Sequence, residues 1–146
     1  EEIKIKEKGK AGRKSVLDGI PSHLPSLLRS QKLQKKAASH GFDWDKISSV
    51  FDKLDEEIAE FKEAVLSRKE EDMAEELGDI LFVLVNIAKF NKIDAEEALR
   101  NTNNKFITRF QHIEVEVTKR GKTLKETPLE ELEQYWQDAK GNKSPS

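Results

Sequence analysis

Residues 53–86 read KLDEEIAEFKEAVLSRKEEDMAEELGDILFVLVN and carry two groups of acidic residues on consecutive segments. The first group has the pattern EExxE and the second, fifteen residues later, has the pattern ExxD. Apolar residues in both segments recur at steps of three and four, which is the period of an amphipathic helix. They are Ile47, Val50, Phe51, Leu54, Ile58, Phe61 and Val65, followed by Met73, Leu77, Ile80, Leu84 and Ile87. Because the connection is short, the two segments are predicted to form an antiparallel helical hairpin.

Acidic residues border both predicted apolar stripes. Lys53, Glu57 and Glu60 project from one flank of the first stripe, whereas Glu56 points away from it. Glu76, Asp79 and Asn86 lie along a flank of the second stripe. Packing the hairpin would bring four carboxylates together, and a hard divalent cation would relieve their repulsion. The alternative is a solvated helix face held by charge pairs one turn apart.

The composition restricts the class of protein. The chain has 146 residues, of which 36% are hydrophobic and 37% are charged, so we expect one domain with a small core. A net charge of −2 predicts no general attraction to nucleic acid or to an anionic membrane. No apolar run reaches membrane-spanning length. The lack of cysteine excludes disulfides and thiolate metal sites and is compatible with a cytoplasmic protein.

The predicted organisation is all-α, a bundle of about five helices built on the hairpin. Residues 1–18 are polar and are expected to be a linker or disordered arm, 19–140 the domain and 141–146 a flexible tail. Since the sequence opens on Glu1, we expect it to be a piece of a longer protein. The segment 81–85 is apolar almost all round its helix and needs cover on every side. This pattern predicts a homodimer.

Two cationic residues follow the acidic groups. Lys105 and Arg109 lie four residues apart on one flank of the fourth predicted helix, at the rim of its apolar stripe. Each could also extend to solvent without a ligand. On the last predicted helix Trp136 shares a face with Leu129 and Leu132, where a core position is its simplest role.

Three kinds of site use several carboxylates, and they differ in the other residues that they require. A di-iron site requires Glu-x-x-His pairs, and none of the three histidines has a glutamate three residues before it. A glycosidase pair leaves the other acids, Lys105 and Arg109 unexplained. Phosphate chemistry uses all of them, because a nucleotide polyphosphate needs Mg²⁺ and cationic side chains to neutralise its charge. The sequence has no GxxxxGK[ST] loop, so metal and side chains would hold the nucleotide.

The ordered combination of these motifs resembles the MazG-type all-α nucleoside triphosphate pyrophosphohydrolases. It consists of KLDEEIAE at 53–60, AEELGDILFVLVN at 74–86, NKF at 104–106 and RF at 109–110. The resemblance continues upstream through GIP at 19–21, LP at 24–25 and GFDW at 41–44, and downstream from RGK at 120–122 to Trp136. It is greatest with the C-terminal catalytic half of two-domain bacterial MazG proteins.

The resemblance implies hydrolysis of a nucleoside triphosphate, NTP or dNTP, to the monophosphate and pyrophosphate, as part of nucleotide-pool house-cleaning. It also implies an intertwined dimer or a higher homo-oligomer. Mg²⁺, with Mn²⁺ as a substitute, would be bound by Glu57, Glu60, Glu76 and Asp79, one of which would also act as the general base. Lys53, Lys105 and Arg109 would contact phosphates and Trp136 the nucleotide, and Asn86 would bind ligand or serve the structure.

One position departs from the family pattern. Relatives often carry lysine four residues before the position of Glu76, where this chain has Asp72, so Lys69 could supply that phosphate contact. A competing hypothesis follows from this departure. The chain would then be a non-catalytic helical module for oligomerisation or regulation within a longer MazG-like protein.

Overall fold

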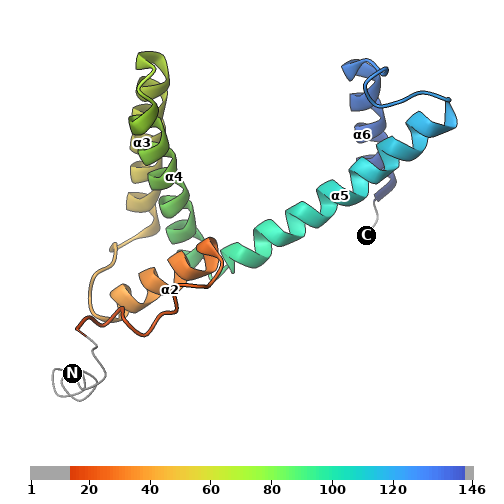
Figure 1. Ribbon diagram of the computed structural model, residues 1–146. Helices are drawn as coiled ribbons and strands as arrows, with labels where there is room; N and C mark the ends of the chain where they lie inside the picture. The colour runs from red at the N-terminus through yellow and green to blue at the C-terminus, as the bar shows by residue number, and fades with distance from the viewer. Residues whose placement is uncertain (1–13, 144–146) are drawn as a thin grey trace. The chain divides into compact units, whose positions relative to one another are not determined.

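The computed structural model describes residues 14–143, and all of their regular secondary structure is helical (Figure 1). The helices are α2 (Ser26–Ser39), α3 (Ile47–Ser67), α4 (Glu70–Phe90), α5 (Ala95–Lys119) and α6 (Leu129–Lys143). The all-α prediction is therefore confirmed. None of these described helices combines the length and hydropathy required to cross a bilayer. Most of the predicted arm, residues 1–13, and the last three residues of the predicted tail lie outside the described residues.

The chain divides into two compact units with a boundary between Glu96 and Glu97. The first unit contains α2, α3 and α4, and the second contains nearly all of α5 together with α6. Each unit is described by itself below. The single domain predicted for residues 19–140 stays a prediction.

A two-residue turn joins α3 to α4 and sets the two helices side by side (Figure 1). Arg68 takes a left-handed conformation with φ of 56° at the end of α3. The backbone N–H groups of Arg68 and Lys69 donate to carbonyl groups of the last turn of α3. These hydrogen bonds satisfy the helix end and reverse the chain, giving the predicted hairpin.

The buried side of α3 consists of three residues spaced by seven, namely Val50, Glu57 and Ala64. On α4 the buried residues include Val83 and Asn86. Four members of the predicted stripes are 43% to 47% exposed, so the hairpin does not bury the whole of either stripe: Phe51, Val65, Leu77 and Leu84. A helix that is apolar on several sides does not reveal from its sequence which side packs. In the fold the flank that carries Glu57 and Asn86 faces inward.

Two buried glutamines tie α2 to the rest of the first unit. The Gln31 side-chain amide donates to the Ile93 carbonyl at 2.8 Å, and its oxygen accepts from the Ala95 N–H at 2.9 Å. Gln34 donates to the Phe82 carbonyl on α4 at 3.1 Å. Gln31 therefore caps the start of α5 from another helix and fixes the loop after α4.

The second unit packs α6 along the C-terminal part of α5. Its buried core is Ile113, Val117 and Tyr135, with Phe110, Leu124, Leu132 and Trp136 packed around it. The Tyr135 hydroxyl donates to the Glu131 carboxylate, and the Arg120 guanidinium lies 4.9 Å from the centre of the Tyr135 ring. This core gives the unit its own apolar interior.

Candidate metal centre

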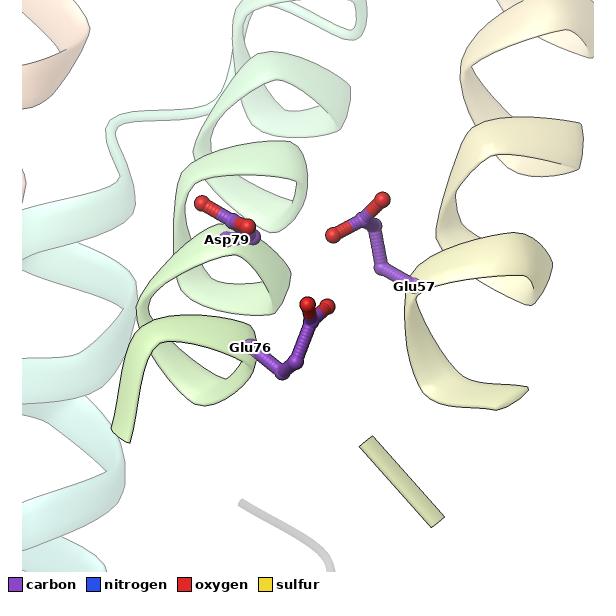
Figure 2. A group of neighbouring side chains, drawn as sticks. All are labelled: Glu57, Glu76 and Asp79. Carbon is purple, nitrogen blue, oxygen red and sulfur yellow. The ribbon is translucent and has the colours of Figure 1, made fainter. Parts of the chain in front are cut away.

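Three carboxylates from the hairpin converge between α3 and α4. One oxygen of each of Glu57, Glu76 and Asp79 lies within 4.8 Å of the others. Glu57 extends from α3 toward α4, and Glu76 extends from α4 toward α3 (Figure 2). Glu76 and Asp79 are three residues apart and so lie on neighbouring positions of one helix face. Oxygen ligands in such a group suit Mg²⁺ or another hard divalent cation.

Glu57 is the buried member of the group, with only 4% of its surface exposed. Its charge is compensated by Lys53, whose Nζ lies 3.1 Å from Glu57 Oε2. The hydrogen bond from Lys53 is the main cause that lowers the pKa of Glu57, and the same bond raises the pKa of Lys53. Both groups are therefore charged at neutral pH, and the lysine neutralises one carboxylate of the centre.

Glu76 lacks such compensation. Desolvation, followed by the negative charges of Glu60 and Glu57, raises the pKa of Glu76 to about 7. Its Oε2 atom is buried and has no hydrogen-bond partner among the described residues. An oxygen in this condition fits a cation, which would favour the ionised form and occupy the unused lone pairs. The donor set therefore fits the divalent metal that the sequence predicts.

The structure places Glu60 beside this centre without including it in the three-carboxylate group. Glu60 is exposed on α3, and its charge is one cause of the raised pKa of Glu76. Asn86 is only 8% exposed, and its Oδ1 finds no partner in the described part of the chain. It lies seven residues beyond Asp79, about 10 Å along the helix, which is too far to share one cation with it.

Three further predicted site residues belong to the second unit. The Arg109 guanidinium lies 5.5 Å from the centre of the Trp136 ring, and the Phe106 ring is 5.6 Å from the same tryptophan. The Nε atom of Arg109 is buried and without a hydrogen-bond partner within residues 14–143. Lys105 is exposed one turn earlier on α5. Arg109 and Trp136 are thus neighbours, whereas a joint role with the carboxylates of the first unit stays a prediction.

One contact beside the centre was not predicted from the sequence. Glu56 is exposed as expected, but its Oε1 atom lies 3.3 Å from Lys53 Nζ. The spacing of three residues between Lys53 and Glu56 is the signal that could have found this pair. Asp72 lies exposed in the first turn of α4 with Glu70 and Glu71. Acidic residues there interact favourably with the helix dipole.

Comparison with known proteins gives consistent matches. The profile of the MazG nucleotide pyrophosphohydrolase domain matches residues 46–114, which include the three converging carboxylates. The nucleoside triphosphate pyrophosphohydrolase/pyrophosphatase MazG of Thermotoga maritima is 40% identical over 141 residues, covering 97% of this chain and 54% of that protein. The nucleoside triphosphate pyrophosphohydrolase of Escherichia coli K12 is 41% identical over 144 residues, covering 96% of this chain and 54% of that protein.

A third relative, the uncharacterized protein YabN of Bacillus subtilis, is 45% identical over 141 residues. That match covers 96% of this chain and 29% of YabN. The chain therefore spans about half the length of the first two relatives and less of the third.

Proposed function

Because residues 46–114 match the MazG nucleotide pyrophosphohydrolase domain, we propose that this chain hydrolyses nucleoside triphosphates to monophosphates and pyrophosphate. The observation that supports this most is the group of carboxylates from Glu57, Glu76 and Asp79 within 4.8 Å. A purely structural hairpin gains nothing from a carboxylate that stays without a cation beside other acidic groups, as Glu76 does among the described residues, since like charges repel one another. A polyphosphate substrate with its cation supplies the missing positive charge.

In this proposal Glu57, Glu76 and Asp79 hold Mg²⁺, with Glu60 as a fourth ligand and Mn²⁺ as a substitute. The bound cation would polarise phosphoryl oxygens and stabilise the charge that develops on them. A water oxygen forms a bond to the α-phosphorus, the bond from that phosphorus to the bridging oxygen breaks, and pyrophosphate leaves. One of the four carboxylates accepts the proton from the attacking water.

The cationic and aromatic residues would bind the rest of the substrate. Lys53, Lys105 and Arg109 would contact phosphate oxygens, and Trp136 would contact the nucleoside. Two buried atoms support ligand contacts, since Arg109 Nε and Asn86 Oδ1 have no partner among the described residues. Each such atom costs free energy unless a ligand or water satisfies it.

The test is a panel of NTPs and dNTPs incubated with the purified protein and Mg²⁺. The proposal expects equimolar monophosphate and pyrophosphate, lost when EDTA removes the cation. Formation of diphosphate and inorganic phosphate would reject the assigned bond cleavage, and an absence of turnover with every nucleotide would reject the activity. The same panel establishes the base and sugar preference, and we place the reaction in the cytoplasm as house-cleaning of nucleotide pools.

We also propose that the protein acts as a homodimer or higher homo-oligomer through α4. Leu77, Leu81, Phe82 and Leu84 are each more than two-fifths exposed on this helix, an apolar surface that a second copy would cover. Sedimentation velocity over a range of concentrations measures the assembly, and a monomer at all concentrations would contradict it.

The same exposed surface favours one competing function, a helical module for oligomerisation or regulation without catalysis. Calorimetric titration with Mg²⁺ and a non-hydrolysable NTP separates the two. The enzyme should show coupled binding of metal and nucleotide, and a scaffold should show none.

A further inference from the structure

Lys53 lies between two carboxylates that differ in their surroundings. Its ammonium is 3.1 Å from Glu57, which is buried in the candidate metal centre, and 3.3 Å from Glu56, which is exposed outside it. On the surface of a helix, the side chains three and four positions after a given residue are both its neighbours in the next turn. One lysine can therefore reach both acids by small rotations of its side chain.

A divalent cation at the centre would compete with Lys53 for Glu57, because Glu57 contributes an oxygen to the carboxylate group. The cation and the Lys53 ammonium also repel each other, because both are positive and both would lie beside Glu57. If Glu57 were its one partner among the described residues, Lys53 would be left without an ion pair there each time the cation is bound. Glu56 provides that second partner, and it is not one of the three grouped carboxylates.

We propose that Glu56 is a positioning residue that retains Lys53 at the rim of the metal centre when a divalent cation takes Glu57. The inference rests on the proposed function, in which the cation binds at Glu57, Glu76 and Asp79. Lys53 then releases Glu57, keeps its ion pair with Glu56 and stays beside the cation. In that position its ammonium faces the place where a phosphate group carried by the cation arrives.

The test measures Mn²⁺ binding to the nucleotide-free protein by electron paramagnetic resonance, so that it does not depend on activity. Replacing Glu56 by glutamine should weaken Mn²⁺ binding by about two- to five-fold, the range expected from one exposed ion pair. The matched control is Glu63→Gln, which removes the same charge from an exposed position two turns further along α3. It should leave the affinity nearly unchanged.

A double-mutant cycle then isolates the role of the lysine. Lys53→Gln alone should tighten Mn²⁺ binding, because it removes the competing cation. In the Lys53→Gln background, Glu56→Gln should change the affinity no more than Glu63→Gln does. Circular dichroism spectra and melting temperatures of all variants check that the exposed substitutions leave the helices folded.

The outcomes separate the two levels of the proposal. If Mn²⁺ binds and Glu56→Gln behaves like Glu63→Gln in both backgrounds, the role of Glu56 is rejected and the metal centre stands. An equal effect of Glu56→Gln with and without Lys53 also rejects it, because the glutamate then acts on the metal by itself. If no Mn²⁺ binds to the wild-type protein, the metal centre and this inference fail together.

Discussion

The α3–α4 hairpin and the α5–α6 unit bury polar groups in opposite ways. In the hairpin, Glu76 Oε2 and Asn86 Oδ1 are buried without partners among the described residues, and carboxylates crowd one another. In the second unit the buried Tyr135 donates to Glu131, and Arg120 both covers the Tyr135 ring and pairs with Glu116 at 2.9 Å.

This difference indicates that the polar groups of the second unit serve its stability, whereas those of the hairpin suit the binding of a ligand. Paired groups around an apolar core stabilise the second unit, whereas unpaired acceptors and like charges lower the stability of the hairpin. Such groups persist in a fold when a ligand completes them. Among the described residues of the second unit the exception is the unpartnered Nε of Arg109, which is also a predicted phosphate ligand.

The largest expected effect is on turnover. Asp79 is exposed, so Asp79→Ala should remove a metal ligand and leave the helical signal unchanged. Loss of a metal interaction worth several kcal/mol corresponds to a fall in kcat of about 10³-fold. The measurement is pyrophosphate release at saturating nucleotide, with the exposed Asp55→Ala as the control variant. Activity near the wild-type level in Asp79→Ala would contradict a catalytic role for the metal centre of the hairpin.

The second effect is on the stability of the other unit. Tyr135 is 6% exposed at the centre of its core, so Tyr135→Ala should lower the free energy of unfolding by about 3 kcal/mol. Urea denaturation followed by circular dichroism measures the change. A loss below about 1 kcal/mol would show that this core contributes little to stability.

The third prediction concerns pH and the metal-free hairpin. The pKa of Glu76 is raised from 4.5 to about 7, so the folded state holds this proton more tightly than the unfolded state. Its contribution to stability is therefore lost as pH rises from about 4.5 through 7. In EDTA, Glu76→Gln should raise the melting temperature at pH 8, and by less at pH 5.

Adding Mn²⁺ at pH 8 provides the control for this prediction. The cation should raise the melting temperature of the wild-type protein, because it binds the folded state. It should raise that of Glu76→Gln by less. A melting temperature of Glu76→Gln below that of the wild type at pH 8 in EDTA would contradict the unfavourable charge assigned to Glu76.

The smallest expected effect separates the contribution of the Tyr135 hydroxyl from that of its ring. Tyr135→Phe keeps the ring and removes only the hydrogen bond to Glu131, so it should cost about 1 kcal/mol. The same denaturation assay compares it with Tyr135→Ala. Equal losses in the two variants would mean that the hydroxyl, and not the packed ring, supplies the stability.

The sequence predicted the helices of the hairpin well, because apolar residues at steps of three and four constrain helix position strongly. α3 ends at Ser67 and α4 ends at Phe90, each within three residues of the last member of its predicted stripe, Val65 and Ile87. The packed face of α4 could not be predicted in the same way, since Leu77 and Leu84 fit a stripe as well as the residues that are buried. Choosing between these faces requires the position of α3.

For the candidate site, the acidic pattern predicted that Glu57, Glu76 and Asp79 lie close together, and they do. Helix periodicity fixes their direction, and the short turn fixes their register. The acidic pattern does not predict contacts between distant segments, such as the two hydrogen bonds between the Gln31 side chain and the backbone of Ile93 and Ala95. Glutamine has no spacing rule that reveals a backbone partner more than sixty residues away.

Glu57 occupies the middle position of a seven-residue repeat, between Val50 and Ala64, where a coiled-coil seam ordinarily carries an apolar side chain. Replacing a buried ion pair by apolar residues of similar size is often neutral or stabilising, whereas removal of one partner is costly only where the other is left buried. Lys53, the partner of Glu57, has a side chain that is 38% exposed. One substitution, Glu57→Leu, would thus complete an apolar seam, remove the buried member of the candidate metal centre and leave Lys53 paired with Glu56.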